Sequence, residues 1–278
     1  MSFKRSGTQV SVPVFFIAFS FVFMLLGSRA TAGPPFLTDD PEPVDYHHYE
    51  FYTFTTFDKN SGIGTTTNAP AVELNYGAIP NIQLHLIVPY TFLSIPMSPT
   101  ALIPGSIPGS TVSGTGDMEL GVKYRFVQET SGRPQIGIFP MAELPTGNSS
   151  NAIGNGRTMY RLPLWVQKSW GPWIASGGGG YALNNAPGQT NFPFGGGLIQ
   201  RNLGEHLTLG GEIYAQGTQF IGDRESTFYN IGGYIVPTKH FNILFSLGHT
   251  ISGDSQTIGY FGLYWTGGPH EAKNNNNG

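Results

Sequence analysis

Apolar and polar residues alternate with a period of two through most of the chain beyond residue 45. The clearest run is residues 116–126, where two sets of side chains alternate: Met118, Leu120, Val122, Tyr124 and Phe126 against Asp117, Glu119, Gly121, Lys123 and Arg125. A period of two places successive side chains on opposite faces of a β-strand. The run therefore predicts a strand with one apolar and one polar face.

The same pattern predicts twelve strands, at about 45–57, 68–79, 81–92, 115–128, 133–145, 157–169, 171–183, 191–202, 205–217, 226–237, 239–251 and 256–266. These strands exceed the globular average of about five or six residues. A tilted strand that crosses a bilayer needs about nine to eleven. In the last strand both faces are rather apolar, so the pattern leaves its orientation open.

The links between these strands alternate in length. Short links lie at 80–81, 130–132, 170–171, 203–204 and 237–239, and longer ones at 58–67, 93–114, 146–156, 184–190, 218–225 and 252–255. Outer-membrane barrels have short periplasmic turns at one end and longer external loops at the other. We therefore expect residues 45–266 to form an all-β, closed antiparallel up-and-down transmembrane β-barrel of about 12 strands.

Composition indicates which face meets lipid. Charged residues are 11% and aromatic residues 13% of the chain, whereas a soluble surface usually carries roughly 25–35% charged residues. The apolar face should then touch lipid and the polar face the interior, with aromatic residues near both membrane interfaces. The alternative is a soluble exported β-protein with the opposite orientation. With 14 basic and 17 acidic residues and no basic block, nucleic acid is not an expected partner.

The two ends of the chain differ from the barrel. Lys4 and Arg5, an apolar stretch and the Ala30-x-Ala32 pattern predict a signal peptide over residues 1–32, cleaved near Ala32; an uncleaved anchor is the alternative. Residues 33–44 are expected to be a periplasmic segment, and residues 267–278 a flexible polar tail. The expected location is the outer membrane of a Gram-negative type of envelope.

Five segments carry a resemblance to a known family: GPPFLTDDPEPVDYHHYEFYTF (33–54), NYGAIPNIQLHLIVPY (75–90), GDMELGVKYRF (116–126), IGIFPMAELPTGN (136–148) and LTLGGEIYAQG (207–217). On these the chain resembles the outer-membrane β-barrels named for the MetA pathway of phenol degradation. The resemblance implies a transporter-like or porin-like barrel whose substrate is not established. The polar tail departs from the usual aromatic C-terminus of such barrels.

Charged side chains on the polar faces are candidate lumen-lining residues: Glu73, His85, Asp117, Glu119, Lys123, Arg125, Glu143, Arg161 and Glu212. Mixed charges in a confined space could set the selectivity of a polar lumen. Alternatively they pair with one another and plug it. His47 and His48 follow Asp39, Asp40, Glu42 and Asp45, and these are possible metal-ligand types. A solvated acidic segment is the preferred interpretation. No catalytic, cofactor-binding or metal-binding residue is predicted.

Together these patterns predict an outer-membrane channel or transporter for small solutes, hydrophobic or aromatic ones among them. Its expected partners are outer-membrane lipid and a small-molecule solute, and its oligomeric state is left open. A structural or adhesive barrel with a plugged lumen is the alternative. An enzymatic barrel would need a nucleophile beside a base, for which Ser246, Ser252, Ser255 and His249 are the candidates; no G-x-S-x-G motif accompanies them, and we expect no enzyme.

Overall fold

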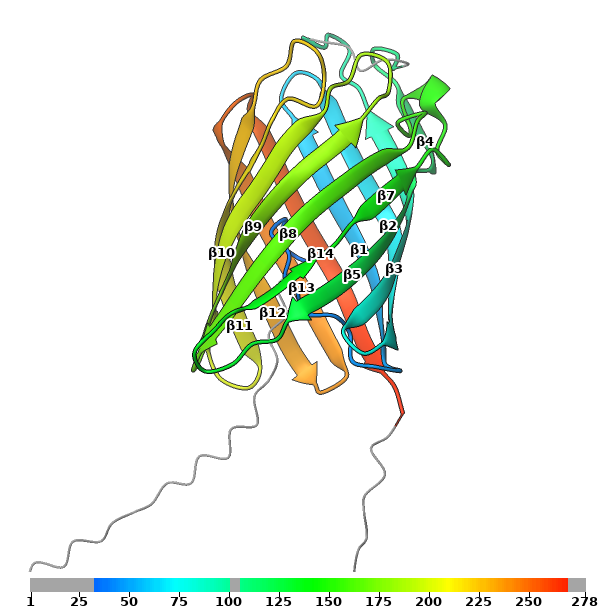
Figure 1. Cartoon of the computed structure of the whole chain (residues 1–278). Helices are drawn as coiled ribbons and strands as arrows, with labels where there is room; N and C mark the ends of the chain where they lie inside the picture. The colour runs from blue at the N-terminus through cyan, green and yellow to red at the C-terminus, as the bar shows by residue number, and fades with distance from the viewer. Residues whose placement is uncertain (1–32, 101–105, 270–278) are drawn as a thin grey trace, which may run out of the picture.

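The first and last strands of the chain pair with each other, and this pairing closes the sheet into a barrel (Figure 1). The computed structural model describes residues 33–100 and 106–269. Strand β1 (Tyr49–Asn60) runs antiparallel to β14 (Gln256–Gly267) over its full length. All other neighbouring strands are antiparallel too, so the predicted closed up-and-down barrel is confirmed. No helix in the described ranges is long and apolar enough to cross a bilayer.

The remaining elements are β2 (Gly64–Ile79), β3 (Ile82–Ser94), β4 (Thr111–Thr115), β5 (Met118–Val127), β6 (Gln135–Ile138), β7 (Met141–Leu144), the short 3-10 helix η1 (Ser149–Asn151), β8 (Met159–Trp170), β9 (Trp173–Asn184), β10 (Phe192–Asn202), β11 (Leu207–Gln216), β12 (Ser226–Thr238) and β13 (Phe241–Ser252). Two of the barrel strands are interrupted: β4 and β5 together make the fourth strand, and β6 and β7 together make the fifth. With each interrupted strand counted once, the barrel has twelve strands, as the sequence predicts.

The two broken walls differ from the continuous strands expected at 115–128 and 133–145. The first is interrupted at Gly116–Asp117 and the second at Phe139–Pro140. Proline has no N–H to give to a sheet ladder. The Pro140 carbonyl still accepts the Val122 N–H at 3.0 Å, so the second wall stays attached to β5 across its break.

The long link expected at residues 58–67 is wrong. The two strands continue to Asn60 and from Gly64, leaving a turn of residues 61–63, in which Gly62 adopts a left-handed φ of 83°. Residues 65–67 pair with both β1 and β3. Their three threonines show no apolar alternation, yet their backbone completes the ladder. The regular alternation of short and long links is therefore interrupted at this end of the barrel.

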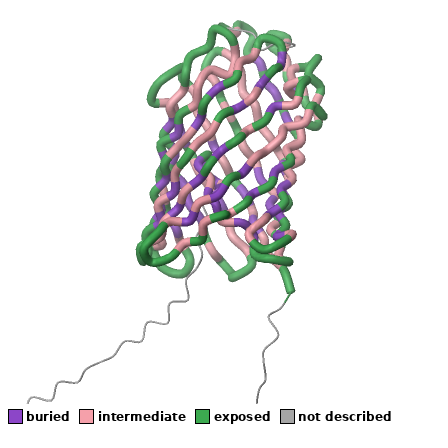
Figure 2. The backbone as a smooth tube through the Cα atoms, in the orientation of Figure 1, coloured by how far each residue is buried: buried purple, intermediate pink, exposed green. Residues whose placement is uncertain are grey.

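The predicted orientation of the barrel faces is confirmed. Along β5, Leu120, Val122 and Tyr124 are 46%, 41% and 41% exposed, whereas Lys123 is only 6% exposed. Figure 2 shows the same alternation of buried and exposed positions along the walls. On β14, whose orientation the pattern left open, Phe261 faces outward and Tyr264 inward.

Exposed aromatic residues mark both ends of the outer surface. On β8, Tyr160 lies near one end and Trp170 at the other, 47% and 57% exposed. With about 3.3 Å per residue and a strand tilt of about 40°, they are separated by about 25 Å along the barrel axis. This matches the height of the apolar band of outer-membrane barrels, which aromatic girdles flank at both interfaces.

Candidate functional site

The described chain begins inside the barrel. Residues 33–44, here called the inserted segment, pass between the walls (Figure 1). Residues 45–47, which are exposed, and His48 then lead to the start of β1. Thr38 and Asp40 are 0% exposed. The expectation of a solvated acidic segment is wrong, because its carboxylates and its backbone find partners on the inner walls.

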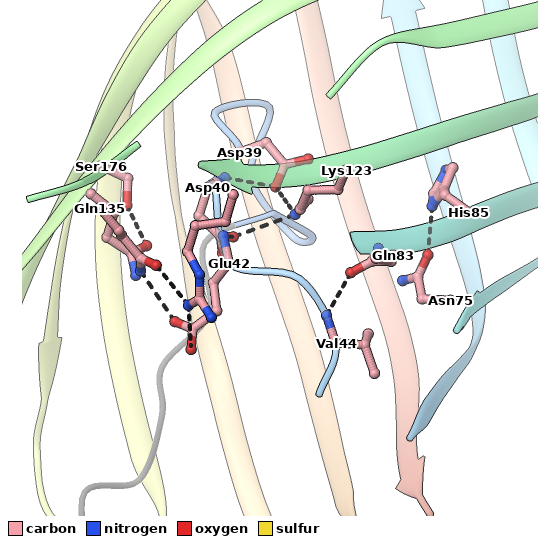
Figure 3. A network of polar contacts seen from close by, with 12 residues as sticks. Asp39, Asp40, Glu42, Val44, Asn75, Gln83, His85, Lys123, Gln135 and Ser176 are labelled. Carbon is pink, nitrogen blue, oxygen red and sulfur yellow. Dashed lines mark hydrogen bonds and ion pairs between the residues drawn. The ribbon is translucent and has the colours of Figure 1, made fainter. Parts of the chain in front are cut away.

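Two cations of β5 hold the acidic side chains of the inserted segment, and Figure 3 shows Lys123 beside Asp39 and Asp40. The Lys123 ammonium donates to Asp39 Oδ1 at 2.9 Å and to Asp40 Oδ1 at 3.3 Å. Arg125 Nη1 lies 3.7 Å from Glu42 Oε1. Burial raises the pKa of Asp40 to about 8, although the neighbouring Lys123 acts in the opposite direction. One side of the inserted segment is thus anchored to β5 through the Lys123–Asp39 and Arg125–Glu42 ion pairs and the Lys123–Asp40 hydrogen bond.

The opposite wall anchors the backbone of the same segment. The Glu212 carboxylate on β11 accepts the N–H groups of Leu37 and Thr38 at 2.8 and 2.7 Å. Ser246 on β13 donates its hydroxyl to the Pro35 carbonyl at 2.7 Å. Bonds to β5 on one side and to β11 and β13 on the other mean that the segment crosses the interior.

A second polar cluster lies on β2, β3 and β5. The two His85 ring nitrogens contact Asn75 Oδ1 at 2.7 Å and Glu119 Oε1 at 3.1 Å. Asn75 donates its amide to Glu73 Oε1 at 2.8 Å. Glu73 and His85 are 3% and 7% exposed. Three of the predicted lumen residues are therefore in one hydrogen-bonded group.

A cavity of about 210 Å³ lies between the inserted segment and this cluster. Its lining includes Arg161, and within the described residues the buried Arg161 Nε, Glu73 Oε2 and Asp40 Oδ2 atoms have no hydrogen-bond partner. Buried polar groups are normally paired, so these three atoms lack the partner that such groups usually have. A larger depression of about 560 Å³ is lined in part by residues 131–134. It lies between the turn that joins β5 to β6 and the adjoining ends of β8 and β9.

Aromatic and aliphatic side chains fill much of the remaining interior in two clusters. The first contains Phe36 of the inserted segment and the wall residues Tyr52, Phe54, Ala71, Leu198, Tyr234, Leu244 and Tyr264. The second contains Phe139, Met159, Trp165, Ala182, Phe192, Phe194, Tyr214 and Phe228. The interior surface is therefore mixed, with ionic groups and aromatic rings side by side.

The other predicted site residues have separate positions. Arg161 interacts electrostatically with Glu119 and Glu143. Glu212 lies on the opposite wall, where it binds the backbone of the inserted segment. Asp117 lies at the break between β4 and β5, where its carboxylate accepts the N–H groups of Gly147 and Asn155 at 2.8 and 2.5 Å. It anchors the loop between β7 and β8 and does not line the cavity.

Sequence reasoning missed several interior groups. Glu50 lies on β1 and accepts hydroxyl hydrogen bonds from Tyr52 and Tyr264 at 3.0 and 2.7 Å. The alternation of Glu50 with its outward neighbours Tyr49 and Phe51 is a signal that could have found it. The carboxylates of the inserted segment have no periodic signal, because their segment is not a strand.

The candidate nucleophiles and base of an enzymatic barrel have other partners. A ring nitrogen of His249 contacts Thr257 Oγ1 at 2.9 Å, and Ser246 donates to the inserted segment. Ser255 Oγ accepts a hydrogen bond from the Ser61 hydroxyl at 3.5 Å. Within the part of the chain that the structure describes, none of these contacts is a serine–histidine pair.

No family model and no curated protein matches the chain. Among solved structures, an outer membrane channel from Pseudomonas putida F1 is similar with a TM-score of 0.64 and 14% identity, over 82% of this chain and 98% of that one. The KdgM porin gives a TM-score of 0.51 and 10% identity, and the NanC porin 0.51 and 8%, each over 77% of this chain and 98% of the other.

These similarities define the class by fold: the chain has the barrel of Gram-negative outer-membrane proteins. Resemblance to the family of the MetA pathway remains a prediction at the finer level, since the structural similarity is to outer-membrane channels in general. The predicted signal peptide lies outside the described residues, as do residues 270–278 of the predicted tail.

Proposed function

We propose that the protein is an outer-membrane channel for small solutes, hydrophobic and aromatic ones among them, and that the inserted segment controls passage through its lumen. The observation that carries this proposal is the non-covalent attachment of the inserted segment, residues 33–44, to the inner wall through ion pairs and hydrogen bonds. Such contacts can be broken and remade without unfolding the barrel, because the barrel ladder itself does not include the segment.

The chemistry of the interior supports solute passage. Burying ion pairs is expensive, and packed apolar residues often stabilise a protein as well or better. Ionic groups beside aromatic clusters instead offer polar and apolar contacts to a passing molecule. Barrels of this shape include proteins described as a channel and as porins, which supports the same proposal.

A purely structural barrel is the second candidate, and the filling of the interior by the inserted segment favours it. Solute flux into liposomes distinguishes the two functions. The full-length chain would be purified from outer membranes and compared with a variant lacking residues 33–44. Heat-dependent migration on gels would confirm that both barrels are folded.

For a channel, we expect measurable entry of a small phenyl glycoside, which lipid alone admits slowly, through the full chain, and at least tenfold faster entry of a small sugar through the deletion variant. The channel proposal fails if neither folded protein admits any solute above the rate of empty liposomes. In that case the structural barrel is the better description.

A further inference from the structure

The cavity beside the inserted segment has the size of a site for one small ring. Its volume is about 210 Å³, and an apolar cavity of about 150 Å³ is enough to hold benzene. It is bounded by the inserted segment and by residues of β1, β2, β3, β5, β7 and β8. A single aromatic ring with a short substituent fits this space.

Negative charge exceeds positive charge around the cavity. Six carboxylates line it, and the cations among its lining residues are Lys123, Arg161 and the titratable His85. The Lys123 ammonium is already shared by two carboxylates of the inserted segment. Glu42 is paired with Arg125, which lies outside the cavity lining. Burial of carboxylates without matching cations is unfavourable, so an added cation would stabilise this arrangement.

Glu73 is the carboxylate with an available acceptor. Its Oε1 accepts the Asn75 amide at 2.8 Å, and His85 Nδ1 lies 3.5 Å from the same oxygen. The other oxygen, Oε2, is buried and has no hydrogen-bond partner within the described residues. Since Glu73 is only 3% exposed and lines the cavity, this oxygen can be satisfied by a donor placed inside the cavity.

The walls around this acceptor include aromatic rings. Tyr52 and Phe139 both line the cavity, and the Phe139 ring already has the Lys123 ammonium 4.9 Å from its centroid. The faces of aromatic rings attract cations and also pack against other rings. The cavity thus combines a vacant anionic acceptor with aromatic surface.

We propose that this cavity binds a small organic cation, namely a primary ammonium attached through a short link to one aromatic ring. The ammonium donates to Glu73 Oε2, and the ring packs near Tyr52 and Phe139. The inference deepens the proposed channel function by naming a solute class, and relies on that function only for the route by which the solute reaches the cavity.

Binding to the purified full-length protein in detergent, measured by calorimetry, tests the proposal. The probes are benzylamine, benzyl alcohol and benzoate, which share a ring and differ in the charge of the substituent. Charge-assisted hydrogen bonds are stronger than neutral ones. We therefore expect benzylamine to bind at least tenfold more tightly than benzyl alcohol, and benzoate to show no measurable binding.

Glu73→Gln keeps the shape of the side chain and removes its charge. It should weaken benzylamine binding at least tenfold and leave benzyl alcohol binding within about twofold. Glu205→Gln, in an exposed turn, is the matched control and should change neither. A folded Glu73→Gln variant with unchanged benzylamine affinity overturns the proposal. Equal binding of benzylamine and benzyl alcohol to the unaltered protein also overturns it, and this test does not depend on the folding of the variant.

The liposome measurements separate this inference from the channel proposal. Selective benzylamine binding without flux of any solute would support the site and contradict the channel. Flux of small solutes without a preference for benzylamine in binding would support the channel and contradict the site.

Discussion

Replacement of Lys123 by methionine should release the inserted segment from the barrel wall. The side chain of Lys123 is 7% exposed, and those of its partners Asp39 and Asp40 are 19% and 1% exposed. Methionine preserves much of the volume of lysine but removes the ammonium. The Asp39 carboxylate would then lose its cation, and Asp40 would lose its charged hydrogen-bond donor.

Removal of one member of a buried ion pair costs about 3–5 kcal/mol. The lower end of this range applies, because water reaches Asp39 and can partly solvate its carboxylate. About 3 kcal/mol corresponds to a shift of about 150-fold in the equilibrium between attached and released segment. The triple variant that also carries Asp39→Asn and Asp40→Asn should recover a large part of this loss, since it leaves no unpaired carboxylate at the site.

A cysteine at position 38 reports release. The chain has no native cysteine, Thr38 is 0% exposed, and its hydroxyl has no hydrogen-bond partner within the described residues. The rate of reaction with a water-soluble thiol reagent follows the released fraction when release is fast compared with labelling. We expect labelling about 150-fold faster with Lys123→Met. Labelling should be unchanged with Lys239→Met, which alters an exposed lysine in the turn between β12 and β13. Equal labelling of the two lysine variants would refute the ion-pair attachment.

Three further outcomes are expected. Because burial raises the pKa of Asp40 to about 8, the attached segment binds the Asp40 proton more tightly than the released one. The contribution of Asp40 to attachment is therefore largest below about pH 4 and is lost as the pH rises toward 8. The test is the ratio of two labelling rates, that of the cysteine reporter and that of the same reporter carrying Asp40→Asn. We expect this ratio to rise between about pH 4 and pH 8. A constant ratio would contradict the raised pKa of Asp40. Gly196→Ala should speed labelling at least tenfold, because a methyl group there collides with the inserted segment, whereas Gly197→Ala, with open space beside it, should have no effect. Ile231 lies midway along β12 and is 64% exposed. In urea unfolding of the barrel in lipid, Ile231→Arg should lower the free energy of unfolding by about 2–4 kcal/mol, and Ile251→Arg, near the end of β13, by about 0–1 kcal/mol. Similar losses at both positions would argue against a lipid-facing surface.

The barrel walls could be predicted from sequence because successive residues of a strand point alternately to the inside and the outside of the barrel. Lys123 and its neighbours on β5 are buried or exposed as their parity requires. The same rule fails where apolar contrast is missing. The threonines at 65–67 pair on both sides, but they resemble a loop in sequence because polar residues occupy both faces.

The inserted segment could not be predicted in this way, since its position depends on groups distant in sequence. Its backbone N–H groups at Leu37 and Thr38 are satisfied by the carboxylate of Glu212, about 175 residues later. No local pattern encodes such a bond. Asp39 and Asp40 resemble a solvated acidic turn until the barrel brings Lys123 next to them.

The glycines of the inner wall argue that the inserted segment is an integral part of the folded barrel. A Cβ atom at Gly137 would lie 2.9 Å from Pro41 Cβ and 2.7 Å from the Tyr124 carbonyl of the barrel. One at Gly196 would collide with the Thr38 hydroxyl and lie 2.8 Å from the Tyr214 ring. These glycines lie on β6 and β10, so two separate walls lack side chains where the segment passes. The same segment has acidic residues where β5 supplies cations. Agreement of both shape and charge from independent walls indicates a specific attachment site, so a change that opens the lumen must overcome these contacts together.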